Sequence, residues 1–166
     1  MKLSEIPRRP VMIMCGISGS GKTYNALRLE AEGYIRVSVD NIIWRNFGSS
    51  LDSLSDSDKR KAFMKANEQA RMETESLIAR GKKVVVDATH CKRIARDEIR
   101  RLCGKYGIYP RFIYLSGSKE ILWSRLSQRK GEGPDDLPVT REQLDDYFIG
   151  FQRPQPDETD IVTLES

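Results

Sequence analysis

Residues 16–23 read Gly-Ile-Ser-Gly-Ser-Gly-Lys-Thr and match the pattern G-x-x-x-x-G-K-[ST] at every fixed position. At ordinary residue frequencies the four fixed positions would coincide by chance in roughly one chain of this length in a couple of hundred. A continuous apolar run precedes the pattern at residues 11–15, and residues 24–32 after it have helical composition. This order of strand, loop and helix is the context that a nucleotide-phosphate loop requires, so the sequence predicts binding of a nucleoside triphosphate.

The glycines of this phosphate loop let backbone N–H groups turn toward phosphate oxygens, and the helix that follows adds its positive end at the same point. We expect Lys22 to reach the β and γ phosphates and Thr23 to place its hydroxyl on Mg²⁺. Magnesium is therefore an implied cofactor, held by phosphates, waters and one or two protein oxygens. The loop residues expected to bind the nucleotide are Gly16, Ser18, Gly19, Ser20, Gly21, Lys22 and Thr23.

The composition fits a single domain that spans residues 1–166. A chain of this length can bury about 70% of its unfolded surface, and its 39% hydrophobic content can supply a core. Three cysteines without a C-x-x-C pair predict neither a disulfide framework nor a thiolate zinc site. No stretch approaches the roughly 18 apolar residues of a membrane span, and residues 1–10 lack the apolar core of a signal peptide. We therefore expect a cytoplasmic protein.

The net charge of +4 does not by itself identify a partner. One basic stretch stands out, because residues 92–105 hold six basic side chains against two acidic ones, whereas the segment after residue 133 is acidic. A stretch of this kind is usually the solvated face of a helix. Contact with nucleic acid is the alternative interpretation.

Strand and helix signals alternate along the chain. Strands are expected at residues 34–39, 83–87, 111–115 and 161–164 besides 11–15, and helices at residues 58–80, 94–106, 118–130 and 141–151. Thr140 and Gln143 form a capping box before the last helix. The pattern predicts an α/β fold with a parallel sheet of about five strands, helices on both faces, and ligands at the carboxyl ends of the strands.

Two stretches are expected to be mobile loops near the site. The first, residues 48–57, is rich in serine, glycine and aspartate, and the second, residues 131–138, is rich in glycine and proline. The second follows a helix that carries arginines. We define residues 118–139 as the lid segment, because a segment that closes over the nucleotide excludes water from a phosphate transfer.

Two aspartates follow predicted strands. Asp40, in Ser38-Val39-Asp40-Asn41, is expected beside the γ phosphate, where a carboxylate can take the proton of an acceptor hydroxyl. Its alternative role is to cap a helix that starts at Ile42. Asp87, at the end of Val-Val-Val-Asp, is a candidate for contact with Mg²⁺ or its waters, although an aspartate is also a common turn residue.

Arg125 and Arg129 lie four residues apart on the predicted lid helix, so both can point from one face toward the phosphates. Guanidinium groups delivered by a closing segment stabilise the charge of the transferring phosphoryl group. Of the two, Arg129 is the stronger candidate, and a solvated helix face is the alternative for the pair. His90, the single histidine, is either a substrate contact or an ordinary loop or core residue.

These residues together resemble the polynucleotide-kinase-like group of P-loop kinases. The resemblance rests on the phosphate loop, on Asp40, on Val-Val-Val-Asp-Ala-Thr at residues 84–89, on the lid arginines and on Phe-Gln-Arg-Pro at residues 151–154. It covers nearly the whole chain and implies a P-loop NTPase fold, ATP as cofactor, and Asp40 as the catalytic base toward a 5′-hydroxyl. It also implies that Arg129 contacts the nucleotide phosphates and that Arg96 is a basic residue near the substrate.

The chain departs from that group at two positions. His90 stands where members often have asparagine, and Ile43 stands where they carry an arginine, so that Arg45 is the nearest candidate for a substrate phosphate. Residues 112–115 followed by Arg-Lys-Gly at residues 129–131 are also similar to gluconate and shikimate kinases. Those enzymes usually carry Asp-x-Asp after the second strand, where this chain has Ser38 in the first position.

The sequence therefore predicts an ATP-dependent kinase, with a polynucleotide 5′-hydroxyl ahead of a small metabolite as the acceptor. A nucleotide-hydrolysing switch is one alternative, but the chain lacks the Asn-Lys-x-Asp and Asp-x-x-Gly patterns expected of one. A nucleic-acid-binding module with a relic phosphate loop is another. The intact Lys22 and Thr23 argue against it.

Overall fold

The structure is a computed structural model that describes residues 1–165. Five strands form one sheet in the order β2-β3-β1-β4-β5, and every neighbouring pair is parallel. Their bounds are β1 Val11–Cys15, β2 Ile35–Ser38, β3 Val84–Asp87, β4 Arg111–Ser116 and β5 Ile161–Glu165. Both β1 and β3 are buried along their whole length, which is typical of parallel strands covered on both faces. The predicted five-stranded parallel sheet is confirmed.

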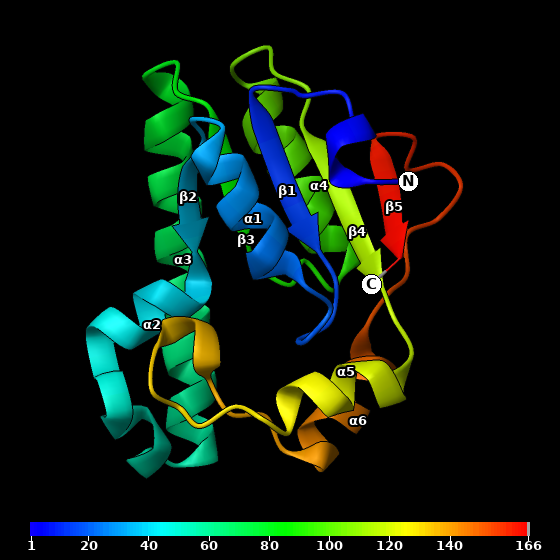
Figure 1. The fold of residues 1–166 in the computed structure, drawn as a ribbon. Helices are drawn as coiled ribbons and strands as arrows, with labels where there is room; N and C mark the ends of the chain where they lie inside the picture. Colours follow the sequence, from blue (N-terminus) through cyan, green and yellow to red (C-terminus); the bar gives the residue numbers. More distant parts are fainter. Residues whose placement is uncertain (166) are drawn as a thin grey trace.

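Six α-helices surround this sheet. They are α1 Lys22–Ala31, α2 Val39–Phe47, α3 Asp56–Ala79, α4 Arg93–Gly104, α5 Lys119–Leu126 and α6 Arg141–Gly150. Three short 3-10 helices are η1 Leu3–Glu5, η2 Gly48–Ser53 and η3 Pro134–Asp136. In Figure 1, α1 covers one face of the sheet, α3 and α4 cover the other, and α5 and α6 lie beyond the carboxyl ends of the strands.

The alternation of side chains along β1 explains the two covered faces. Met12 and Met14 pack into the core that includes Leu29 of α1, whereas Val11 and Ile13 belong to the core on the side of α3 and α4. A third cluster joins Leu122 and Leu126 of α5, Leu144 of α6 and Ile17 of the phosphate loop. The lid segment and the last helix are thus packed directly on the loop. The capping box of Thr140 and Gln143 is confirmed.

Among the predicted element boundaries that are wrong, two affect the site. The second strand ends at Ser38, because the Ser38 hydroxyl accepts a hydrogen bond from the Asn41 amide at 3.2 Å and caps a helix that begins at Val39. Asp40 therefore neither ends a strand nor caps a helix at Ile42, and it lies in the first turn of α2. The lid helix ends at Leu126 rather than at residue 130.

The predicted loop at residues 48–57 is also different in the structure, since η2 and the first turn of α3 occupy most of it. The Ser55 hydroxyl caps α3 by accepting from the Asp58 amide, so this helix begins two residues earlier than predicted. Within residues 1–165, no helix is both long enough and apolar enough to cross a membrane.

Candidate active site

The phosphate loop connects β1 to α1 at the centre of the sheet. A Cβ atom added to Gly16 would lie 2.7 Å from the backbone oxygen of Leu115, and one added to Gly19 would lie 3.1 Å from that of Leu122. Gly19 also has a left-handed φ of 84°. The loop backbone thus runs so close to β4 and α5 that glycine is required at both positions.

The amino end of α1 faces this loop without a side-chain cap, because its N-cap is Gly21. Free N–H groups at a helix start are suited to an anion. Ser20 is buried, and its hydroxyl oxygen has no hydrogen-bond partner among the described residues. An unpartnered buried hydroxyl beside an uncapped helix start fits a bound phosphate group. The phosphate loop can therefore hold the triphosphate that its sequence predicts.

Lys22 begins α1, and its ammonium donates a hydrogen bond to the Ile17 backbone oxygen at 3.0 Å. Burial lowers the pKa of Lys22, while the carboxylates of Asp87 and Asp40 act in the opposite direction. Lys22 therefore contacts the phosphate loop through a hydrogen bond and interacts with the two carboxylates through its charge. A cation in this position can contact the terminal phosphates of a nucleotide.

Thr23 and Asp87 form a pair of adjacent oxygens at the carboxyl end of β3. The Thr23 hydroxyl donates to Asp87 Oδ2 at 2.9 Å, and the Asp87 side chain is only 4% exposed. Oxygen donors of this kind fit Mg²⁺. The described residues contain no group of three His, Cys, Asp or Glu side chains that could hold a metal. A metal at Thr23 and Asp87 would need further ligands from the nucleotide and water.

Asp40 lies half-buried in the first turn of α2. Burial raises its pKa, the charges of Lys22 and Arg129 lower it, and the carboxylates of Asp87 and Asp135 raise it again. These partners come from the phosphate loop, β3 and the lid segment. The structure thus brings the predicted base, lysine, metal carboxylate and lid arginine into one electrostatic cluster.

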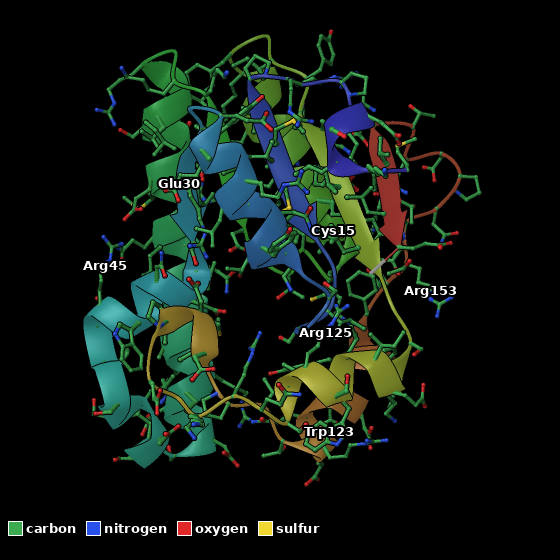
Figure 2. All side chains as sticks on the ribbon, viewed as in Figure 1. Cys15, Glu30, Arg45, Trp123, Arg125 and Arg153 are labelled. Carbon is green, nitrogen blue, oxygen red and sulfur yellow. The ribbon has the colours of Figure 1, made fainter. Side chains whose placement is uncertain are left out.

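The two lid arginines do not share a helical face, because α5 ends between them. Arg125 donates to the Gly19 backbone oxygen at 3.0 Å and so contacts the phosphate loop directly. Figure 2 shows it between α5 and that loop. Arg129 follows α5 and donates to the Leu137 backbone oxygen at 3.1 Å, which joins the two ends of the loop between α5 and α6.

The expectation that Arg96 contacts the substrate is wrong for this structure. Its side chain is 0% exposed and donates to both carboxylate oxygens of Glu158, at 2.8 and 2.7 Å. The same guanidinium donates to the backbone oxygens of His90 and Gln152. Arg96 therefore has no surface left for a substrate and holds three segments together instead.

His90 supports the strand that leads into the phosphate loop. Its Nδ1 atom lies 2.8 Å from the Met14 backbone oxygen, and burial lowers the pKa of the ring. His90 also has a φ of 47°, which is uncommon outside glycine. The neighbouring Thr89 accepts a hydrogen bond from the Gly16 amide at 3.0 Å. This geometry favours the structural alternative for His90.

A cavity of about 300 Å³ lies between α2, α3 and the lid segment. Arg45, the predicted substrate residue, lines it from the last turn of α2, and the Arg45 guanidinium lies 3.3 Å from a carboxylate oxygen of Glu73. In Figure 2, Arg45 lies beside α2 at the left of the view. The buried side-chain oxygen of Asn41 has no partner among the described residues. This cavity, called the α2 cavity below, is lined by Arg36, Ser38, Asn41, Ile42, Trp44, Arg45, Glu73 and Pro134.

Comparison with known proteins agrees with this arrangement. Residues 11–154 match the sequence model of a family described as AAA domain. The chain belongs to this AAA domain family. A probable gluconokinase from Schizosaccharomyces pombe is 25% identical to the AAA domain chain over 162 residues, which are 95% of this chain and 80% of that protein.

Two solved structures share the fold of this AAA domain. The gluconokinase from Sinorhizobium meliloti 1021 has a TM-score of 0.64 and 24% identity, and the match covers 96% of this chain and 84% of that one. A chain of the Pnkp1/Rnl/Hen1 RNA repair complex has a TM-score of 0.66 and 18% identity, with 90% and 46% covered. The fold is that of the P-loop kinases, and the predicted family resemblance is confirmed.

Sequence reasoning missed two residues of the AAA domain site. Arg36 of β2 donates to Asp87 Oδ2 at 2.6 Å and to Asp135 of η3 at 2.8 Å. The only signal in the sequence is a charged residue within a short strand. Tyr147 of α6 is the second candidate, because burial and then the charge of Asp40 raise its pKa, while 40% of the residue is exposed. The α6 pattern did not single out this tyrosine.

The basic stretch at residues 92–105 of the AAA domain is largely neutralised within the chain. Arg93 pairs with Asp157 at 2.8 Å, and Arg100 pairs with Asp160 at 2.7 Å. The acidic segment that precedes β5 thus folds back along α4. Guanidinium groups that are engaged in this way do not form a free surface for a polyanion, so the structure favours the structural interpretation of this helix.

Proposed function

We propose that this protein is an ATP-dependent kinase that transfers the γ-phosphate of ATP to a hydroxyl group of a small, hydroxylated acceptor. The observation that carries the proposal is that the charges of Lys22 and Arg129 act on Asp40, while the cavity of about 300 Å³ begins at the next residue, Asn41. The phosphate loop suits a triphosphate, and the cavity offers a partly open space for an acceptor.

In the proposed reaction the acceptor oxygen bonds to the γ-phosphorus while the bond to the β,γ-bridging oxygen breaks and ADP leaves. The Asp40 carboxylate takes the proton of the acceptor hydroxyl. Lys22 and the lid arginines neutralise the charge on the transferring group. Thr23 and Asp87 would hold Mg²⁺, which would neutralise part of the phosphate charge.

The electrostatics of Asp40 support its role as a base. Burial raises its pKa and so makes the carboxylate a better proton acceptor, while the charges of Lys22 and Arg129 favour its ionised form. A carboxylate made more basic by burial and flanked by cations is suited to removing a proton from a hydroxyl.

Two observations support a small acceptor over the polynucleotide that the sequence placed first. A cavity of about 300 Å³ is at the lower end of ligand pockets, and the lid segment closes one side of it through Pro134. Four of the six basic residues in the stretch that would track a polynucleotide pair with carboxylates of the same chain, namely Arg93, Arg96, Arg100 and Lys105. The Arg45 guanidinium, whose side chain is 61% exposed at the cavity, favours an acceptor that also carries an anionic group. The similarity to a probable gluconokinase agrees with such a molecule.

A 5′-hydroxyl polynucleotide end is the second candidate acceptor. Arg45 favours it, because its side chain is 61% exposed at the rim of the cavity, where a phosphate outside the cavity could reach it. The fold shared with a chain of the RNA repair complex is compatible with this acceptor as well.

Separate measurements of binding and turnover test the proposed roles. Lys22→Ala should weaken Mg-ATP binding in calorimetry by at least about tenfold, because it removes the charge that contacts the terminal phosphates. Asp40→Asn should leave that binding within about twofold and abolish most phosphate transfer. Full transfer by the Asp40 variant, or unchanged ATP affinity without Lys22, would refute the assignment.

A further inference from the structure

Arg36 is a charged residue in the strand β2, and its side chain is only 5% exposed. A buried guanidinium is costly unless carboxylates pair with it. Arg36 has two such partners that come from different parts of the chain. One is Asp87 at the end of β3, and the other is Asp135 in η3, 99 residues away in sequence.

One carboxylate oxygen of Asp87 accepts three hydrogen bonds. Asp87 Oδ2 accepts from Arg36 Nη2 at 2.6 Å, from Arg36 Nε at 3.1 Å and from the Thr23 hydroxyl at 2.9 Å. Three donors fix the direction of this carboxylate. Arg36 therefore orients the side chain that lies beside the predicted metal position.

The contact with Asp135 has a different consequence. Arg36 Nη2 lies 2.8 Å from Asp135 Oδ1, and the Asp135 side chain is 41% exposed. Figure 1 shows that the chain after α5 crosses from the lid helix to α2, where η3 lies. Pro134, the neighbour of Asp135, lines the α2 cavity together with Arg36. This ion pair is thus a polar anchor of the lid tip at the cavity.

Burial of Arg36 alone does not require Asp135, because Asp87 already supplies a carboxylate at 2.6 Å. The second pair instead joins the lid tip to the residue that orients Asp87. The result is a continuous chain of hydrogen bonds from Thr23 through Asp87 and Arg36 to Asp135. It runs from the phosphate loop to the lid segment.

We propose that Arg36 is a positioning residue that couples closure of the lid segment to the orientation of Asp87. The Arg36–Asp135 ion pair holds η3 over the α2 cavity. When η3 is held in this way, the Arg36–Asp87 pair fixes the Asp87 carboxylate beside the predicted metal position. This inference rests on the proposed kinase function for its consequence in turnover, whereas the coupling itself is a property of the chain without an acceptor.

Hydrogen exchange of the lid amides at residues 130–139 tests the coupling on the full chain. Asp135→Asn should speed exchange of these amides about three- to tenfold, because one ion pair that holds the closed lid is lost. Glu132→Gln is the matched control, since it removes the same charge from the same exposed loop without touching Arg36. Asp135→Glu keeps a carboxylate for Arg36, so its lid amides should exchange as slowly as those of the wild type. Amides of β1 and β3 should exchange equally in all four proteins.

A second pair of variants isolates the role of Arg36. In an Arg36→Gln background, adding Asp135→Asn should produce no further acceleration of lid exchange, because the partner is already gone. Equal lid exchange in the wild-type and Asp135→Asn proteins, or an additive effect of the two substitutions, would overturn the coupling. If Arg36→Gln does not fold, the comparison of Asp135→Asn with Asp135→Glu and Glu132→Gln decides alone.

The two proposals fail in distinguishable ways. Accelerated lid exchange without phosphate transfer to any hydroxyl would remove the kinase proposal and leave the coupling intact. Phosphate transfer with lid exchange that does not respond to Asp135→Asn would remove the coupling and leave the kinase proposal intact.

Discussion

Asp40 is the proposed proton acceptor, so its titration should appear in the pH dependence of the phosphate-transfer rate. Burial raises the pKa of this carboxyl above its ordinary value. Only the ionised form accepts a proton, and phosphate transfer should therefore fall as the pH is lowered through this raised pKa. Asp40→Asn should lower transfer by about 10²- to 10⁴-fold and remove this acidic limb from the pH–rate profile. An unchanged acidic limb in the variant would assign the titration to another group.

Gly19 offers a second test at the scale of one residue. Gly19→Ala places a Cβ atom 3.0 Å from the Leu126 side chain and 3.1 Å from the Leu122 backbone oxygen, at a φ of 84°. We expect the loop to move away from α5 and Mg-ATP affinity to drop more than about tenfold. Gly81→Ala is the matched control, because Gly81 also has a positive φ of 69° but meets nothing within 4 Å. Calorimetry with Mg-ATP should give near-wild-type affinity for the control.

At the scale of the elements, the Arg96–Glu158 pair joins α4 to the segment before β5. Arg96→Met should destabilise the fold by about 3–5 kcal/mol, because it leaves the buried Glu158 carboxylate without its main partner. The double variant Arg96→Met/Glu158→Met should lose less stability than the single one, since no buried charge is then unpaired. Urea unfolding of the three proteins measures this difference. A double variant less stable than Arg96→Met would contradict the account.

The same pair predicts how stability depends on pH. Burial raises the pKa of Glu158, but hydrogen bonds from Arg96, the Gln155 amide and Arg100 outweigh it and bring the pKa to about 2. A carboxyl whose pKa is lower in the folded state stabilises the fold above its unfolded pKa of 4.5. This contribution is lost progressively as the pH falls from 4.5 toward 2. Unfolding measured across this range should show a weaker pH dependence in Glu158→Gln than in the wild type.

Local patterns predicted the elements where a local cause dominates. The phosphate loop and the apolar runs of β1 and β3 determine their own conformation, and the parallel direction of the strands follows from the alternation of strands and helices. The start of α2 was mispredicted because Ser38, rather than Asp40, provides the cap. That choice depends on where the backbone turns, and several capping residues stand in a row there.

Roles that depend on partners distant in sequence could not be predicted. Arg96 was assigned to the substrate through the family resemblance alone, because its partner Glu158 lies 62 residues away and only the fold brings them together. Arg36 was missed for the same reason, since strand pairing places it on Asp87 and lid packing places it on Asp135. Lys22, Asp87 and Asp40 could be proposed from the sequence because Lys22 belongs to the phosphate loop, Asp87 ends β3 and Asp40 follows β2 by two residues.

At the level of the whole molecule, the proposed phosphate transfer requires that the phosphate loop, the α2 cavity and the lid segment act as one site. The most direct measurement is transfer of label from γ-labelled ATP with Mg²⁺ to a panel of gluconate, shikimate, other small polyols, nucleosides, and 5′-hydroxyl DNA and RNA oligonucleotides, with Asp40→Asn as the inactive control. We predict label on a small hydroxylated acid with the wild-type protein and none with the variant. Label on the oligonucleotides alone, or release of phosphate to water with no labelled acceptor, would contradict the proposed small-molecule kinase.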